Sequence, residues 1–207
     1  MELDIFIKVV FICMVGAMSP GPSWVLIINK SLSAGKMGGF LTSIGHGVGI
    51  ALYALIANIG IGVILNTNII LFNGIKIFSI IFLMYLGYKS FQSKPVSLIE
   101  QKLNTGIKSF LEGLSFALLN PKVLIWFIAI YSQFMSANNN VIFNFYLISI
   151  AGIVDACWYV ILTLAITTSS ALSFFIKKIS IIQKIQGYFF IAIGLGLAVN
   201  LFYIFTI

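Results

Sequence analysis

The sequence predicts an all-α membrane protein with six transmembrane helices in two inverted halves of three, in which helices 1 and 4 are broken. Three observations lead to this fold class. Hydrophobic residues make up 60% of the 207 residues and charged residues only 8%, against roughly 25% in soluble domains. The charges concentrate in a few short segments and leave uncharged runs long enough to span a bilayer. Prolines interrupt the first and the fourth of the expected spans.

The first three spans are expected at about 5–29, 39–65 and 69–91. Residues 9–29 carry no charge and form most of the first span. Residues 37–75 carry no charge either, but a spanning helix needs only about 20 residues. The polar segment Asn66-Thr67-Asn68 therefore separates the second span from the third, which ends near Lys89.

The other three spans are expected at about 109–135, 142–168 and 182–206. The polar segment 136–140 divides the uncharged run 123–154 between the fourth and the fifth span, and residues 185–207 form most of the sixth. All six should be helices, because only helices and closed barrels satisfy their backbone hydrogen bonds in lipid. Alternating ten-residue strands, which would indicate a barrel, are absent.

The distribution of lysine predicts the topology. The chain has no Arg, and most of its lysines follow spans 1, 3 and 5: Lys30, Lys36, Lys89, Lys94, Lys102, Lys108, Lys177, Lys178 and Lys184. The connections after spans 2 and 4 carry no charge. The positive-inside rule then places the lysine-bearing loops in the cytoplasm and both termini outside. The net charge of +7 therefore indicates membrane topology, and no nucleic-acid partner is expected.

We expect one transmembrane domain over residues 1–207, with halves at about 1–95 and 105–207 joined by a cytoplasmic loop. Each half has three spans, so the two halves face opposite ways, as in inverted-repeat transporters. Pro20 and Pro121 lie about half the chain apart, each after a polar residue, Ser19 or Asn120.

The segments Ser19-Pro20-Gly21-Pro22 and Asn120-Pro121 predict helices that end and restart inside the membrane. Proline lacks an N–H and clashes with the carbonyl four residues earlier. Ser or Asn before proline is typical of an N-cap followed by the first helical residue. A restarted helix offers unpaired N–H groups to a carboxylate, while the freed carbonyls suit an ammonium group. Two matching breaks favour a substrate site over two structural kinks.

Embedded charges are the second functional signal. Asp155 lies near the middle of the fifth span, where an acid costs roughly 2.5–3.5 kcal/mol to insert. Such a group relays a proton, faces a cavity or anchors a hydrogen bond. Trp158 and Tyr159 share its helix face and either flank a substrate or pack between helices. Lys76 either extends to the surface, pairs with Asp155 or binds a substrate carboxylate. Lys122, at the restart of span 4, is unfavourable for the helix dipole and could serve an anionic guest.

The remaining reactive residues give weaker signals. We interpret His46 as a buried hydrogen bonder, since no acid stands near it in the sequence, with a proton-sensitive gate as the alternative. Cys13 and Cys157 leave open a thiol-disulfide conduit, which we regard as the weakest alternative. No metal-ligand cluster, cofactor motif or catalytic motif is present, so we expect no enzyme and no cofactor. Efflux of a metal ion or another small solute remains an alternative.

Together these residues resemble the lysine exporter (LysE/RhtB) family of bacterial amino-acid exporters. The resemblance rests on four segments: Ser19-Pro20-Gly21-Pro22, Lys76 with Tyr85-Leu86-Gly87, Leu119-Asn120-Pro121-Lys122, and Asp155 with Trp158-Tyr159. It implies secondary export of amino acids across the bacterial inner membrane, often driven by protons, with the proline breaks as the substrate region. Relatives often have an acidic residue or His in the middle of span 2, where this sequence has Ile50 and Tyr53.

The resulting hypothesis is an antiporter that rocks its two halves around a central site. The substrate carboxylate would meet the helix starts at Pro22 and Pro121, and its ammonium group would meet freed carbonyls or Asp155. Proton exchange at Asp155 would couple export to the gradient, and a neutral amino acid is favoured slightly because few acids are embedded. The expected partners are the amino acid and the lipid bilayer, with a homodimer as a further option.

Overall fold

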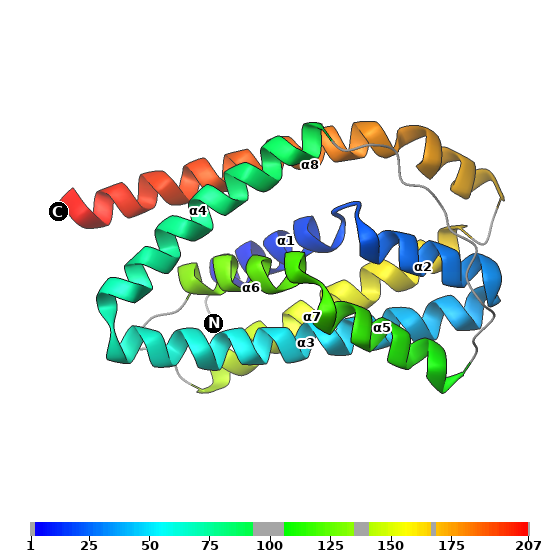
Figure 1. The fold of residues 1–207 in the computed structure, drawn as a ribbon, viewed down its shortest axis with the longest axis horizontal. Helices are drawn as coiled ribbons and strands as arrows, with labels where there is room; N and C mark the ends of the chain where they lie inside the picture. The colour runs from blue at the N-terminus through cyan, green and yellow to red at the C-terminus, as the bar shows by residue number, and fades with distance from the viewer. Residues whose placement is uncertain (1–2, 93–105, 135–140, 167–168, 207) are drawn as a thin grey trace.

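The computed structural model describes residues 3–92, 106–134, 141–166 and 169–206 (Figure 1), and all regular structure in them is helical. This confirms the predicted all-α, multi-pass membrane class. Four helices are each long and apolar enough to cross a membrane: α3 (Gly35–Thr67), α4 (Ile69–Phe91), α7 (Val141–Ile166) and α8 (Ser169–Thr206). The other four form two bent pairs: α1 (Leu3–Ala17) with α2 (Pro22–Ser33), and α5 (Ile107–Leu119) with α6 (Pro121–Phe134).

Counting each bent pair as one span gives the six expected spans. The largest difference from expectation is the start of the last helix, at Ser169 instead of about residue 182. Lys177, Lys178 and Lys184 lie within this helix and do not end it. The expected boundary between the halves, at 95–105, lies outside the described residues.

The two halves run in opposite directions along the bundle (Figure 1). The α1–α2 pair runs from left to right, α3 returns and α4 crosses again, whereas the α5–α6 pair runs from right to left. Both ends of the chain consequently lie to the left of the breaks. The last turn of α2 and the start of α8 lie at the opposite end, on the right, whereas α4 ends midway along the bundle, above the breaks.

Glycines allow the backbones of the two halves to approach closely at α3. A Cβ at Gly45 would lie 2.0 Å from the Phe110 carbonyl oxygen on α5, and a Cβ at Gly47 would lie 2.8 Å from the Gly152 carbonyl oxygen on α7. Small residues are the usual means by which membrane helices pack this tightly. The residue between them, His46, is therefore held where helices of the second half meet the first.

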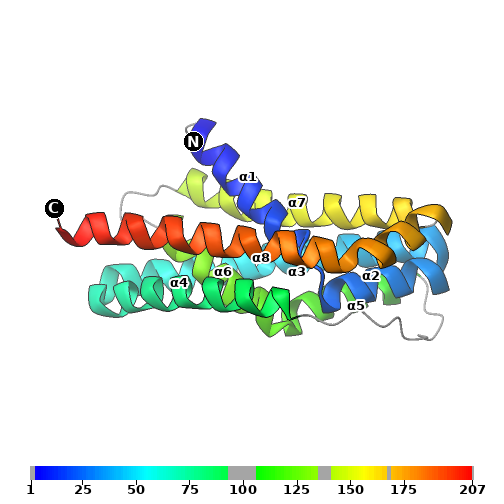
Figure 2. The same ribbon diagram turned by 90° about the horizontal axis from the view of Figure 1, so that it is seen from above.

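On the other side of the bundle α4 packs against α8, and Figure 2 shows the two side by side. Gly87 and Gly187 face each other there, since a Cβ on either would lie 2.9 Å from the carbonyl oxygen of the other. Large apolar side chains such as Ile56, Ile59 and Val63 are exposed, as expected for helices whose solvent is lipid.

Candidate functional site

Both predicted helix breaks are present. The axis turns by 68° between α1 and α2 and by 61° between α5 and α6. At the second break Asn120 acts as predicted, because its Oδ1 accepts a hydrogen bond of 3.0 Å from the Lys122 backbone N–H in the first turn of α6. At the first break the predicted N-cap is wrong. Gly21 occupies that position with an extended backbone and no side-chain cap, because α2 begins only at Pro22.

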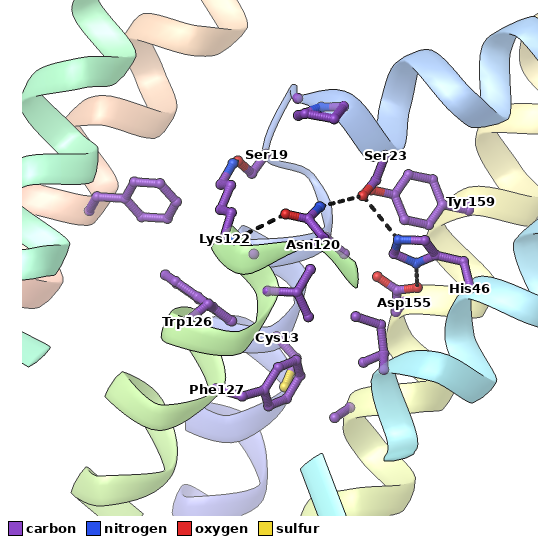
Figure 3. A pocket seen from close by; sticks show the side chains of 18 residues that line it. Cys13, Ser19, Ser23, His46, Asn120, Lys122, Trp126, Phe127, Asp155 and Tyr159 are labelled. Carbon is purple, nitrogen blue, oxygen red and sulfur yellow. Dashed lines mark hydrogen bonds and ion pairs between the residues drawn. The ribbon is translucent and has the colours of Figure 1, made fainter. Parts of the chain in front are cut away.

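A pocket of about 60 Å³ lies between the two breaks and reaches α3, α7 and α8. Figure 3 shows that its polar side chains come from both halves of the chain. They are Ser19, Ser23, His46, Asn120, Lys122, Asp155 and Tyr159. By this measure one water molecule needs roughly 10–15 Å³, so the pocket is large enough for several.

Four of these side chains form a hydrogen-bonded chain across the pocket (Figure 3). Asn120 Nδ2 donates to Ser23 Oγ at 3.2 Å, Ser23 Oγ lies 3.0 Å from His46 Nε2, and His46 Nδ1 lies 2.7 Å from Asp155 Oδ2. The Tyr159 ring stands edge-on to the imidazole at a centroid distance of 4.9 Å. All four members of the chain are buried, and they tie α2, α3 and α7 to the second break.

The structure confirms His46 as a buried hydrogen bonder and identifies the partner of Asp155. His46 does have an acidic neighbour, but one that is 109 positions away along the chain. Asp155 pairs with this histidine and not with Lys76. The glycines on either side of His46 were the available signal, because they mark the face that packs against the second half.

Lys122 forms another polar contact between the halves. Its Nζ donates to Ser19 Oγ, and Ser19 Oγ also accepts from Gln186 Nε2 of α8. Among the described residues, no carboxylate lies within ion-pairing distance of Lys122. A cation inside a membrane protein is costly unless a partner or a cavity compensates it. Here the cation faces the pocket beside the first break, so the geometry leaves it free to meet an anion.

The remaining wall of the pocket is apolar. Trp126, Phe127, Phe190, Ile50 and Ala151 line it. The Trp126 ring packs against Phe190 at 5.1 Å, and Gly16 leaves room for the indole, since a Cβ there would lie 2.8 Å from Trp126 Nε1. The pocket therefore has charged groups at Lys122 and Asp155 and an apolar part centred on Trp126, Phe127 and Phe190.

The other predicted site residues are placed as follows. Gly21, Pro22 and Tyr159 line the pocket, whereas Pro20 and Trp158 do not, and Trp158 packs against Trp24 at 5.8 Å. Lys76 lies outside the lining, with its Nζ 4.8 Å from the centre of the Phe72 ring. Pro121 begins α6, and its side chain is not among those described.

No group of three His, Cys, Asp or Glu side chains gathers anywhere in the described ranges. The two cysteines are unbonded: Cys13 is buried and lines the pocket, whereas Cys157 is exposed on α7. A thiol-disulfide conduit would require the two cysteines to come into contact.

A family model described as LysE type translocator matches residues 14–201, a range that contains both breaks and Asp155. Uncharacterized membrane protein YrhP of Bacillus subtilis (strain 168) is 29% identical over 196 residues, covering 88% of this chain and 91% of that protein. Leucine efflux proteins of Salmonella choleraesuis (strain SC-B67) and Salmonella typhimurium (strain LT2) are 28% identical over 152 residues, covering 70% of this chain and 71% of theirs. No solved structure gives a significant match.

Proposed function

This chain belongs to the LysE type translocator family, and on that premise we propose that it exports neutral amino acids with apolar side chains by proton-coupled antiport. The observation that carries the proposal is the pocket between the two breaks. It brings together a cation without a carboxylate partner among the described residues, a buried acid and an apolar wall. An amino acid with an apolar side chain needs these three features, one each for its carboxylate, its ammonium group and its side chain.

The carboxylate end of the substrate is assigned to Lys122 and the first break. The Lys122 ammonium group has Ser19 as a hydrogen-bond partner and no carboxylate partner among the described residues. The start of α2 adds a partial positive charge, because Gly21 provides no side-chain cap for its free N–H groups. Charge-assisted hydrogen bonds to a carboxylate are about twice as strong as neutral ones.

The ammonium end is assigned to Asp155, which is the one acid among the described residues that line the pocket. The substrate side chain then meets the apolar wall around Trp126 and Phe127. A lysine or arginine substrate would bring a second positive charge for which this lining holds no second acid. Burial of an unpaired charge is costly, so the pocket favours neutral substrates. The relatives named as leucine efflux proteins agree with this choice.

The inverted halves suggest alternating access by rocking around the pocket, with the protein in the inner membrane and its lysine-rich end in the cytoplasm. Both termini would then be outside. At that end the buried Lys30 of α2 forms an ion pair with Glu112 of α5, which joins the halves. Asp155 would couple export to the proton gradient, because it is both ionisable and within reach of the substrate.

The proposal is tested by efflux from cells fed dipeptides that contain leucine, threonine or lysine. Cells that carry the protein should release leucine faster than cells that carry the empty vector, and an uncoupler should remove the difference. Lysine release should not change. Export at the wild-type rate by Asp155→Asn would remove this residue from the mechanism, and equal release of every amino acid with and without the protein would exclude the function.

A further inference from the structure

The hydrogen-bonded chain of Asn120, Ser23, His46 and Asp155 constrains where a proton can be held. An amide nitrogen only donates, so the Asn120 side chain requires Ser23 Oγ to accept. An ionised carboxylate only accepts, so Asp155 requires a hydrogen on Nδ1 of His46. The partners therefore assign every hydrogen in the chain except the one between Ser23 and Nε2.

The hydrogen bond between Ser23 Oγ and His46 Nε2 can be formed in two ways. When the imidazole is neutral, the Ser23 hydroxyl donates to Nε2. When the imidazole is charged, Nε2–H donates to Ser23 Oγ, which accepts this second hydrogen bond while its own hydrogen turns to the hydroxyl oxygen of Tyr159, a further hydrogen-bond partner of Ser23. Both states keep every bond of the chain at the observed distances. One proton can thus be added at Nε2 without breaking any contact.

The charge of the His46–Asp155 pair changes with that proton. With neutral His46 the pair carries one negative charge, which an ammonium group can approach. With charged His46 the pair is neutral, and its imidazolium repels an ammonium group. Beside His46 and Asp155, the titratable groups among the described residues that line the pocket are Lys122 of α6, Tyr159 of α7 and Cys13 of α1. Outside the lining, Lys30 of α2 is paired with Glu112 of α5.

We infer that His46 carries the exchanged proton, and that this proton and the substrate ammonium compete for the single negative charge of Asp155. This inference rests on the proposed function and names the group behind its coupling. At the proton-rich face a proton binds to Nε2 and the amino acid leaves. At the cytoplasmic face the proton dissociates from Nε2 and the negative charge of the pair returns. Antiport then follows from competition, since the pocket holds a proton or an ammonium group but not both.

The test uses the purified full-length protein with L-leucine as the probe. His46 is the single histidine of the chain, so selective ¹⁵N labelling of histidine gives NMR signals from this ring alone. At a constant, mildly acidic pH, saturating leucine should move these signals toward the neutral ring. In the pH range where His46 is protonated, leucine affinity should fall about tenfold for each unit by which the pH is lowered. This is the slope expected for one competing proton.

The variant His46→Gln separates this proposal from a structural role of the imidazole. A glutamine amide can donate to Asp155 and accept from Ser23, but it takes up no proton. Its leucine affinity should change less than about twofold between roughly pH 5 and 8, the range in which histidine normally changes charge. In proteoliposomes it should retain measurable leucine exchange and lose uptake driven by a pH gradient. Ser43→Ala, a buried hydroxyl one turn away on α3, is the matched control and should keep the wild-type slope.

The outcomes are distinguishable. If His46→Gln binds leucine with the wild-type pH slope, or if leucine leaves the imidazole signals of the wild type unchanged, His46 does not carry the proton. The proposed export would survive that result, with Asp155 itself as the titrating group. If the wild-type protein neither binds nor exchanges leucine or any other amino acid, the proposed function fails.

Discussion

Replacement of Lys122 by methionine tests the assignment of the substrate carboxylate. Methionine has a similar length and no charge, so the variant removes the ammonium group and leaves most of the packing against the first break. Lys122 has Ser19 as its hydrogen-bond partner but no carboxylate partner among the described residues, so the change leaves no acid unpaired there. Ser19 retains the hydrogen bond from Gln186.

The magnitude follows from the contact that is lost. A hydrogen bond to a charged group contributes about 1.5–3 kcal/mol. Since about 1.4 kcal/mol corresponds to a tenfold change in affinity, leucine should bind about 10- to 150-fold more weakly to Lys122→Met. An amide or amine derivative of leucine, which lacks the carboxylate, should bind the variant and the wild type nearly equally.

The assay is equilibrium binding of labelled leucine to the purified protein, with thermal stability measured on the same samples. Lys36→Met is the matched control, because Lys36 is exposed at the start of α3 and lies outside the pocket lining. If Lys122→Met binds leucine within about twofold of the Lys36→Met control, well below the effect of a charged hydrogen bond, the carboxylate does not bind at Lys122.

Three further predictions follow from the packing and the ion pairs. Gly45→Ala should destabilise the protein by about 1–3 kcal/mol in a thermal or denaturant assay, because its Cβ would lie 2.0 Å from a carbonyl oxygen of α5. Gly60→Ala, on the same helix with nothing within 4 Å, should leave stability equal or slightly higher, and equal losses in the two variants would contradict the packing argument. Glu112→Gln should lower stability by about 3–5 kcal/mol because Lys30 is 1% exposed, and the double variant with Lys30→Met should recover part of the loss; no recovery would show that the ion pair is not the cause. Cys157→Ala should keep uncoupler-sensitive leucine efflux, whereas loss of efflux with intact folding would revive the redox conduit.

Local features of the sequence were sufficient for most of the fold. The six expected spans match the two bent pairs and the four long helices. Each span depends on the hydropathy of its own roughly 20 residues, so no knowledge of neighbouring helices was needed. The break at Pro22 follows from the chemistry of proline in the same way.

Errors arose where a residue's role depends on its exact place in the chain or on a distant partner. The sequence predicts Ser19 as the cap of α2, but Gly21 precedes the first residue of α2, and the Ser19 side chain contacts Lys122 of the other half. Lys76 was considered a candidate partner of Asp155, and it lies outside the pocket beside Phe72. A helical period indicates which residues share a face of one helix, but not which helix that face meets.

The sequence by itself determined the membrane class, the number of spans, the two broken helices and the family, because hydropathy, proline chemistry and short motifs are properties of contiguous residues. Only the tertiary structure decided that His46 meets Asp155 across 109 positions and that Lys122 meets Ser19 across 103. These pairs depend on the rotation and depth of each helix, which are set where the glycines of α3 let α5 and α7 approach. The pocket chemistry is consequently a property of the packed halves and not of either half alone.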